Sequence, residues 1–247
     1  MEFGIIGFPL GHSFSPDYFN KKFRELNLHS YNYLAFPLED ISILPKMIEQ
    51  NPLLLGLSIT IPHKESVLQF LDFKSKVVEE IGACNCIKII RKPNKIQLHG
   101  FNTDVIGFEK SLLNFIGNFR PKALILGSGG ASKAAQFVLR KIGIDFKVVS
   151  RAKYDNRLFY NEINQTILDE FHLIINTTPL GMLPNIDSKP EIPYRFLTPN
   201  HFLFDMVYNP EETAFLKEGR IGGTKIKNGL EMLHFQAEAA WNIWENG

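Results

Sequence analysis

The segment Ala123-Leu124-Ile125-Leu126-Gly127-Ser128-Gly129-Gly130-Ala131-Ser132 decides the fold of the second half of the chain. Four apolar residues predict a buried strand, and a glycine-rich turn then leads into helix-forming sequence up to about Lys141. Such a turn lets the backbone approach a pyrophosphate, whose charge is stabilised by the free N–H groups and dipole of the following helix. Because Ser132 replaces the third glycine of the dinucleotide-binding pattern, a tight turn without a ligand is the alternative.

The next predicted strand carries the residues expected to select the cofactor. Phe146–Val149 predicts a parallel strand that runs into Ser150 and Arg151, with Lys153 close by. An NAD-binding unit ends this strand with a carboxylate for the ribose 2′-hydroxyl, whereas a guanidinium suits a 2′-phosphate. We therefore expect NADP rather than NAD, although Asp155 keeps NAD open as an alternative.

The composition is that of a soluble globular protein. The chain has 247 residues, enough for one large domain or two of ordinary size, and 45% of them are hydrophobic. The net charge of +1 gives no reason to expect nucleic acid or a membrane surface as a partner. No apolar run approaches the roughly 20 residues that span a bilayer. We expect no signal peptide, and reduced, buried Cys84 and Cys86 on one face of a strand, which fits a cytoplasmic protein without a metal site.

A strong helix start follows the first predicted strand, Phe3–Gly7. In Ser15-Pro16-Asp17, serine is a preferred N-cap, proline suits the first helical position, and aspartate meets the positive end of the dipole. The predicted helix runs to about Leu26. Ser13 and Ser15 also place two hydroxyls at this helix end, where they could bind a carboxylate. Capping alone is the alternative for Ser15.

A second candidate strand end lies at Leu53–Ile59, which leads into Thr60 and Lys64. We expect a helix to begin at Pro62. In open α/β sheets ligands bind outside the carboxyl ends of strands, so Thr60 and Lys64 occupy candidate positions. A lysine near a helix start is unfavourable against the dipole, which favours a functional Lys64 over a solvated surface cation.

One β-hairpin is predicted, in which Ile87–Ile90 and Ile96–His99 are joined by Lys92-Pro93-Asn94-Lys95. The following segment, Gly100–Gly107, opens a helix with Asp104 in its first turn. Taken alone, an aspartate at this position indicates a structural role. The pattern predicts two α/β units that join near Gly100–Asn102.

These motifs, in this order, resemble those of the shikimate dehydrogenase family. The resemblance runs from Phe3 to the C-terminus. The matching segments are Gly7–Pro16, Ser58–Lys64, Gly82–Asn85, Gly100–Asp104, Leu126–Ser132, Asn176–Met182, Asp205–Pro210 and Gly229–Leu233, followed by Gln236.

The resemblance implies reversible hydride transfer between NADPH and the 3-keto group of 3-dehydroshikimate, giving shikimate in chorismate and aromatic amino acid biosynthesis. A ketone that accepts hydride develops alkoxide charge and needs a positioned acid, and the resemblance implies Lys64 and Asp104 as the catalytic acid–base pair. The implied substrate-binding residues are Ser13, Ser15, Ser58, Thr60, Asn85, Tyr208 and Gln236. The implied cofactor-binding residues are Gly127, Ser128, Gly129, Gly130, Ala131, Ser150, Arg151, Lys153, Thr177, Met206 and Gly229.

The implied fold is α/β, with an N-terminal substrate domain on a mainly parallel sheet and a Rossmann-type dinucleotide-binding domain. The active site is expected in the cleft between them. We expect residues 1–101 to form the substrate-binding and catalytic domain, completed by a C-terminal helix in 225–247, and residues 102–224 to form the NADP-binding domain. The protein is expected to be a monomer or a homodimer.

The chain also departs from the family pattern. The departures are Ser58 in place of Asn, Cys86 in place of Thr, Ser150-Arg151-Ala152 in place of N-R-T, Asp155 in place of a second arginine, and a short segment between Arg151 and Phe171. They leave an NAD-dependent quinate/shikimate dehydrogenase as the alternative, whereas Ser13, Ser15 and Arg151 favour the NADP enzyme. A non-catalytic nucleotide sensor is a second alternative, but it would not need Lys64 together with Asp104.

Overall fold

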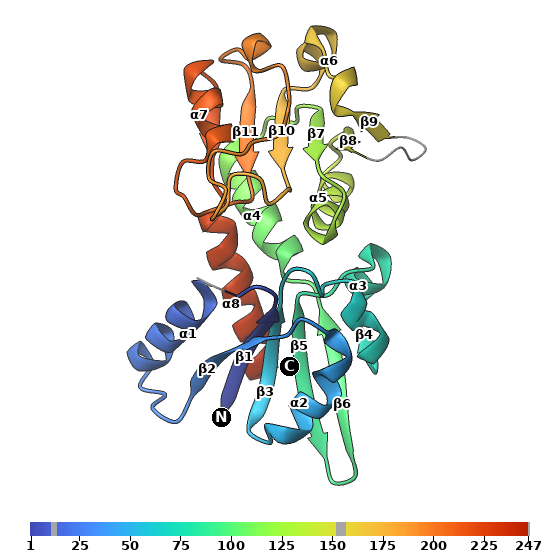
Figure 1. The fold of residues 1–247 in the computed structure, drawn as a ribbon, viewed down its shortest axis with the longest axis vertical. Coiled ribbons are helices and arrows are strands. Elements are labelled where there is room, and N and C mark those ends of the chain that lie inside the picture. The colour runs from blue at the N-terminus through green and yellow to red at the C-terminus, as the bar shows by residue number, and fades with distance from the viewer. Residues whose placement is uncertain (11–13, 152–156, 247) are drawn as a thin grey trace. The chain divides into compact units, whose positions relative to one another are not determined.

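The computed structural model describes residues 1–10, 14–151 and 157–246. The chain divides into two compact units (Figure 1). The first comprises Met1–Thr103 and Ala237–Gly247, and the second comprises Asp104–Gln236. The last helix contributes residues to both units, whereas the predicted domain ranges place it wholly with the first domain. Those ranges stay a prediction.

The first unit is built on a mainly parallel six-stranded sheet. The strand order is β2 (Asn32–Pro37), β1 (Glu2–Gly7), β3 (Leu54–Ile59), β5 (Cys86–Lys92), β6 (Lys95–Phe101) and β4 (Phe73–Lys74). Strands β2, β1 and β3 are parallel, and β4 is parallel to β6. Strand β5 is antiparallel to both β3 and β6. The predicted hairpin is therefore confirmed, with Pro93 and Asn94 between its two strands.

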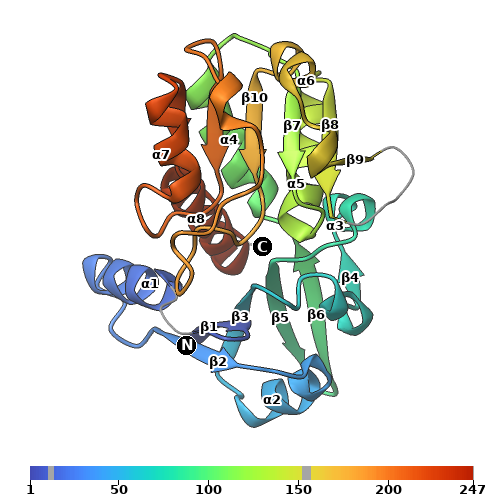
Figure 2. The same ribbon diagram turned by 45° about the horizontal axis from the view of Figure 1, so that its top comes forward.

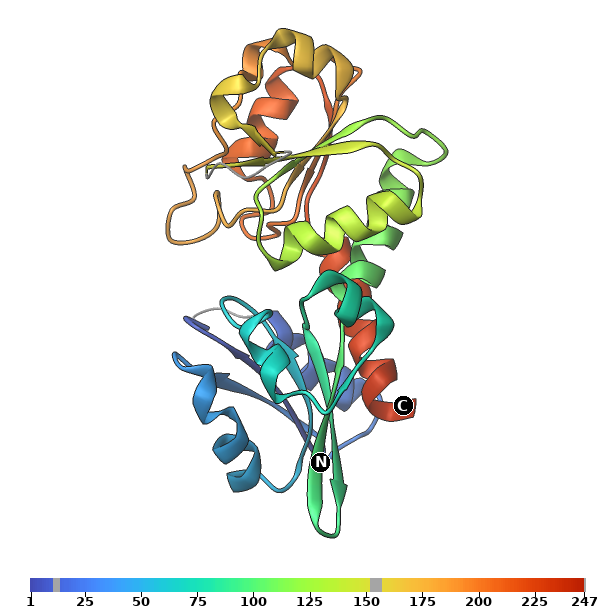
Figure 3. The same ribbon diagram turned by 90° about the vertical axis from the view of Figure 1, so that its right-hand side faces the viewer.

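Two hydrophobic cores cover the two faces of this sheet (Figure 3). One lies under α2 (Leu44–Gln50) and α3 (Lys76–Ile81), and the other lies under α1 (Phe14–Glu25) and the end of α8 (Leu230–Asn246). Cys84 belongs to the first core and Cys86 to the second, and both are free thiols. The expectation that they share one face is wrong. Strand β5 begins at Cys86, so strand alternation does not apply to Cys84.

The second unit has the parallel sheet of a Rossmann-type fold. The strand order is β12 (Lys225–Lys227), β11 (Phe202–Asp205), β10 (Leu173–Asn176), β7 (Ala123–Leu126), β8 (Phe146–Ser150) and β9 (Arg157–Phe159). Every pairing in it is parallel. This confirms the predicted α/β class and the Rossmann-type unit. Edge strand β9 lies in the short segment between Arg151 and Phe171, for which no strand was predicted.

Helices cover both faces of the second sheet (Figures 2 and 3). Helix α4 (Asp104–Ile116) packs with α5 (Gly130–Lys141) on one side. Helices α6 (Gln165–Glu170) and α7 (Ala214–Ile221) share a hydrophobic core on the other. No described helix is both long enough and apolar enough to span a membrane.

The C-terminal end of α8 is anchored in the first unit by Trp244. Its indole stacks on Phe3 at a centroid distance of 5.1 Å, and its Nε1 donates to the carbonyl of Ile87 at 3.0 Å. The indole also lies against the backbone of Gly56, where a Cβ atom would stand 2.5 Å from the ring. Glycine at position 56 is therefore required by packing.

Candidate active site

The carboxyl ends of β1 and β3 meet at one edge of the first sheet. The Thr60 N–H donates to the carbonyl of Ile6 at 2.9 Å. Gly7 lies so close to Thr60 that a Cβ atom on Gly7 would stand 2.3 Å from the Thr60 methyl group. The sheet therefore brings Thr60 against the end of β1, at the position where ligands of α/β sheets bind.

Lys64 lies in a turn beyond β3, and the expectation of a helix starting at Pro62 is wrong. The Lys64 carbonyl accepts a hydrogen bond from the Cys84 N–H at 2.7 Å, so its partner is not a residue of a helix that begins at Pro62. A 3₁₀ helix follows only at Ser66–Phe70. The dipole argument for Lys64 therefore fails. Its backbone is instead fixed by a hydrogen bond to the residue that precedes Asn85.

Asn85 holds the segment that leads into α4. Its Nδ2 donates to Thr103 Oγ1 at 3.0 Å, and its Oδ1 accepts from the Thr103 N–H at 2.6 Å. The neighbouring Asn102 donates to the carbonyl of Ala83 at 2.9 Å. These side chains are all buried. They fix the backbone just before Asp104, which is the first residue of α4 and is itself buried. Sequence reasoning missed the part played by Thr103.

Ser15 and Ser58 are both buried. The Tyr33 hydroxyl donates to Ser58 Oγ at 2.7 Å, and Ser15 lies near the same phenol. Ser15 was expected to be the N-cap of helix α1. The helix begins at Phe14, so Ser15 lies within its first turn and the expectation is wrong. Sequence reasoning did not identify Tyr33 at all.

The remaining predicted substrate residues are divided between the second unit and the undescribed segments. Tyr208 and Gln236 belong to the second unit, where Gln236 Nε2 donates to the carbonyl of Leu233 at 3.1 Å. Close to Gln236, α4 and α8 approach at Gly107, where a Cβ atom would stand 2.5 Å from the carbonyl of Met232. Ser13 and the predicted cofactor residue Lys153 lie outside the described residues.

The turn after β7 has the backbone that a dinucleotide-binding loop needs. Gly127 has a φ of 111°, which favours glycine, and a Cβ atom there would stand 2.7 Å from Thr177 Oγ1. Thr177 in turn donates from its hydroxyl to the carbonyl of Leu126 at 2.7 Å. The end of β10 is therefore hydrogen-bonded to the end of β7, and the predicted cofactor residues Gly127 and Thr177 lie in contact.

The N-terminus of α5 is free to receive an anion. Its N-cap is Gly129, which provides no side-chain hydrogen bond, and the space where a Cβ atom would lie is open to 4 Å. The first turn carries no acidic residue. Ser132, at the position of the third glycine, is buried and accepts from Gln136 Nε2 at 3.1 Å, so it does not obstruct the turn. Ser128, Gly130 and Ala131 complete this loop, and the arrangement fits a pyrophosphate.

The ends of β10 and β11 are joined by a buried polar network around Asp205. Its carboxylate accepts from Thr213 Oγ1 at 2.6 Å, from Asn176 Nδ2 at 3.0 Å and from the Val207 N–H at 3.0 Å. Burial raises the pKa of Asp205 to about 6, against the lowering effect of these hydrogen bonds. The network fixes the loop that begins at Met206.

Two predicted cofactor residues come together beyond this network. Gly229 lies against Met206, whose carbonyl oxygen would stand 2.2 Å from a Cβ atom at position 229. The Gly229 N–H donates to the carbonyl of Val207 at 3.1 Å. At the end of β8, Ser150 is buried and Arg151 is exposed. The charge of Arg151 acts on Tyr160, where it opposes the increase in pKa that burial causes. An exposed guanidinium at this strand end suits a 2′-phosphate.

No group of three His, Cys, Asp or Glu side chains suited to a metal ion occurs within residues 1–10, 14–151 and 157–246.

Comparison with known proteins identifies similar chains over nearly the full length. A family model described as the shikimate dehydrogenase substrate binding domain matches residues 5–87. The shikimate dehydrogenase (NADP(+)) of Methanococcus vannielii is 36% identical over 261 residues, which cover 98% of this chain and 90% of the relative. The crystal structure of shikimate dehydrogenase from Aquifex aeolicus matches with a TM-score of 0.87 and 32% identity, covering 100% of this chain and 93% of that chain. Shikimate 5-dehydrogenase from Thermus thermophilus, solved in complex with NADP(H) and shikimate, matches with a TM-score of 0.85 and 30% identity, covering 100% of this chain and 94% of that chain.

Proposed function

The chain belongs to the shikimate dehydrogenase family, and on this premise we propose that it catalyses the reversible NADPH-dependent reduction of 3-dehydroshikimate to shikimate. The observation that carries the proposal is the open, uncapped N-terminus of α5 beside the contact between Gly127 and Thr177. This arrangement fits a dinucleotide, and the first unit supplies polar side chains at its strand ends for a polyhydroxylated acid.

When bound, NADPH supplies the hydride, and the protein has to supply a proton to the oxygen that becomes a hydroxyl. We assign this task to Lys64 and Asp104. An ammonium group can protonate the developing alkoxide, and a carboxylate can orient that ammonium and accept from a substrate hydroxyl. We treat the two as one acid–base pair.

The other side chains bind and orient the substrate in this proposal. Ser13 and Ser15 bind its carboxylate with help from Tyr208. The residues assigned to its ring hydroxyls are Ser58, Thr60, Asn85, Asp104 and Gln236. Since the amide of Asn85 is already bonded to Thr103, a substrate hydroxyl at Asn85 would also contact the segment that carries Asp104. A site with several such partners rejects analogues that leave them unpaired.

Cofactor selection rests on the exposed Arg151, with Lys153 as the second cation near the 2′-phosphate. We also propose that the protein works in the cytoplasm as a monomer or a homodimer. Sedimentation at several protein concentrations distinguishes these two states.

The experiment that tests the function is a set of initial rates with shikimate and quinate, each with NADP+ and NAD+. We expect a strong preference for shikimate with NADP+. Lys64→Ala should lower kcat by about 10²–10⁴-fold, because it removes the general acid. Lys21→Ala is the matched control, since this lysine is on the surface of α1 and its ion pair among the described residues is with the exposed Glu25. Quinate turnover with NAD+ would identify the quinate/shikimate type instead, and NADP+ binding without any turnover would identify a nucleotide sensor.

A further inference from the structure

Tyr33 is a buried phenol in the middle of the first unit. It lies on β2, and its ring stacks on Phe19 of α1 at a centroid distance of 4.6 Å and an interplanar angle of 12°. Trp244 packs against the ring from α8 at 6.1 Å. Only 2% of the residue is exposed. The ring is therefore enclosed by aromatic side chains from two helices.

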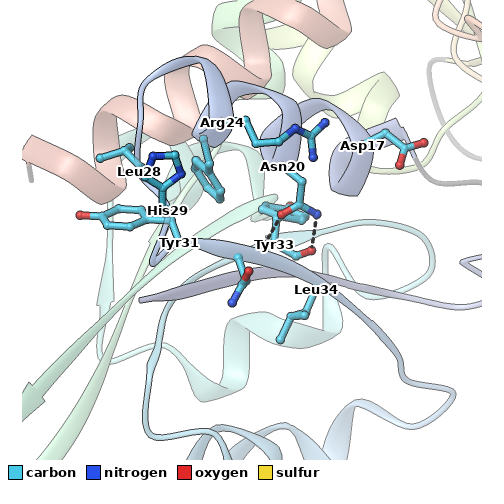
Figure 4. Close-up of a pocket in the computed structure, with 10 residues that line it drawn as sticks. Asp17, Asn20, Arg24, Leu28, His29, Tyr31, Tyr33 and Leu34 are labelled. Carbon is cyan, nitrogen blue, oxygen red and sulfur yellow. Dashed lines mark hydrogen bonds between the residues drawn. The ribbon is translucent and has the colours of Figure 1, made fainter.

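The backbone of Tyr33 is fixed as firmly as its ring. β2 is an edge strand, so the Tyr33 N–H and C=O that face away from β1 have no strand partner. The side chain of Asn20 takes that place, as Figure 4 shows: its Oδ1 accepts from the Tyr33 N–H at 2.9 Å and its Nδ2 donates to the Tyr33 carbonyl at 3.0 Å. The position of the phenol oxygen is therefore well defined.

This oxygen is hydrogen-bonded to a serine on another strand. Tyr33 donates to Ser58 Oγ, at the end of β3, at 2.7 Å. A phenol has one proton, and here Ser58 receives it. Burial raises the pKa of Tyr33 well above its usual range, so the proton stays on the phenol at neutral pH.

We propose that Tyr33 is a positioning residue for substrate recognition, whose buried hydroxyl fixes the Ser58 hydroxyl by donating a hydrogen bond to it. This inference rests on the proposed function, because it assumes that Ser58 contacts shikimate. Donation by Tyr33 to Ser58 leaves the Ser58 proton free for an oxygen of the substrate. Two successive hydrogen bonds of this kind strengthen one another away from solvent. Tyr33 thus acts on the substrate through Ser58.

The test is Tyr33→Phe, which removes the hydroxyl and keeps the ring. Losing the hydrogen bond that fixes Ser58 should raise the KM and the dissociation constant for shikimate about tenfold. We expect kcat to change less than about threefold and KM for NADP+ to stay constant, because no step of the acid–base pair passes through Tyr33. Binding is measured by titration calorimetry as well as by kinetics, so that the result does not depend on turnover.

Tyr31→Phe is the matched control. Tyr31 belongs to the same aromatic cluster, and its ring is seen in Figure 4 to the side of Tyr33. Removing its hydroxyl should leave shikimate binding unchanged. The double variant Tyr33→Phe/Ser58→Ala should bind shikimate no more weakly than the weaker of its two parents, because Tyr33 acts through Ser58.

Several results would overturn the inference. One is unchanged shikimate binding in Tyr33→Phe. Another is an additive loss of shikimate binding in the double variant. A third is a fall in the melting temperature of Tyr33→Phe together with a rise in both KM values, for shikimate and for NADP+, which a merely structural role would give. If Tyr33→Phe does not fold, tyrosine labelled with ¹³C at Cζ gives a second test in the wild type. The Tyr33 resonance should shift on adding shikimate, and a constant resonance would refute the inference. Wild-type binding of shikimate without turnover would refute the proposed function alone, and absence of binding would refute both.

Discussion

Asp205 gives the protein a dependence of stability on pH that can be isolated with one substitution. The carboxylate is fully buried and accepts hydrogen bonds from Thr213, Asn176 and Val207. Its pKa is raised from 3.8 to about 6, chiefly because burial disfavours the charged form. Asp205→Asn keeps the shape and one acceptor oxygen and removes the charge.

The magnitude follows from linkage. A raised folded-state pKa stabilises the folded protein below the unfolded-state pKa, and this contribution is lost as pH rises through the folded-state value. Between pKa values of 3.8 and about 6, the contribution of Asp205 amounts to about 3 kcal/mol. At pH 4 the unfolded chain is already partly ionised, so the free energy of unfolding of Asp205→Asn, minus that of the wild type, should increase by about 2.4 kcal/mol from pH 4 to pH 8. Because all other titratable groups are the same in both proteins, their contributions cancel in this difference of unfolding free energies.

The assay is urea unfolding of the full chain at several pH values, followed by circular dichroism. Asp187→Asn serves as the control, because Asp187 is exposed, and its unfolding free energy should follow that of the wild type at every pH. Parallel curves for the wild type and Asp205→Asn would refute the reasoning. They would mean that the carboxyl group titrates in the folded protein as it does in the unfolded chain, because it is solvated better than its surroundings suggest.

Two glycine substitutions test the close contacts at the sites. Gly127→Ala puts a side chain 2.7 Å from Thr177 Oγ1 at a φ of 111°, so the KM for NADP+ should rise at least about tenfold in steady-state kinetics, with KM for shikimate constant. An equal rise in both KM values would contradict a role confined to the cofactor. Gly56→Ala forces the indole of Trp244 to move, so the free energy of unfolding should fall by about 1–3 kcal/mol and the tryptophan fluorescence should change. Wild-type stability would show that Trp244 is not held against Gly56.

The parts of the fold that the sequence predicts are those set by neighbouring residues. Four apolar residues before Gly127 suffice to predict β7, and the hairpin at Pro93 follows from alternation on either side of a turn. The cofactor-binding turn after β7 was predictable for the same reason, since the conformation of a glycine-rich turn is set by its own residues. The roles of Lys64 and Asp104 came from the resemblance, because a lone lysine or aspartate has no local pattern that identifies its chemistry.

Several features that the sequence did not predict depend on contacts between residues that are distant in sequence. Pro62 indicated a helix start, but the Lys64 carbonyl bonds to Cys84, and no local signal encodes that contact. Tyr33 lies in a segment whose alternation predicts a strand. That pattern gives the face of the sheet but does not reveal that Ser58, 25 residues away, is the partner of the phenol. The same holds for Asn20, whose side chain occupies the free edge of β2.

The two units solve one physical problem in the same way. A loop at the carboxyl end of a strand has to hold functional groups still without the hydrogen bonds of a helix or sheet. In the first unit Asn85 supplies these bonds to Thr103, and in the second Asp205 supplies them to Asn176 and Thr213. Burying such groups costs stability unless each is fully bonded, and for Asp205 the raised pKa is a direct sign of that cost. Apolar side chains in place of Asn85 and Asp205 could give an equally stable core. They would leave the backbone groups of the two loops without hydrogen-bond partners. We therefore expect substitutions in either network to disturb ligand binding even where they stabilise the fold.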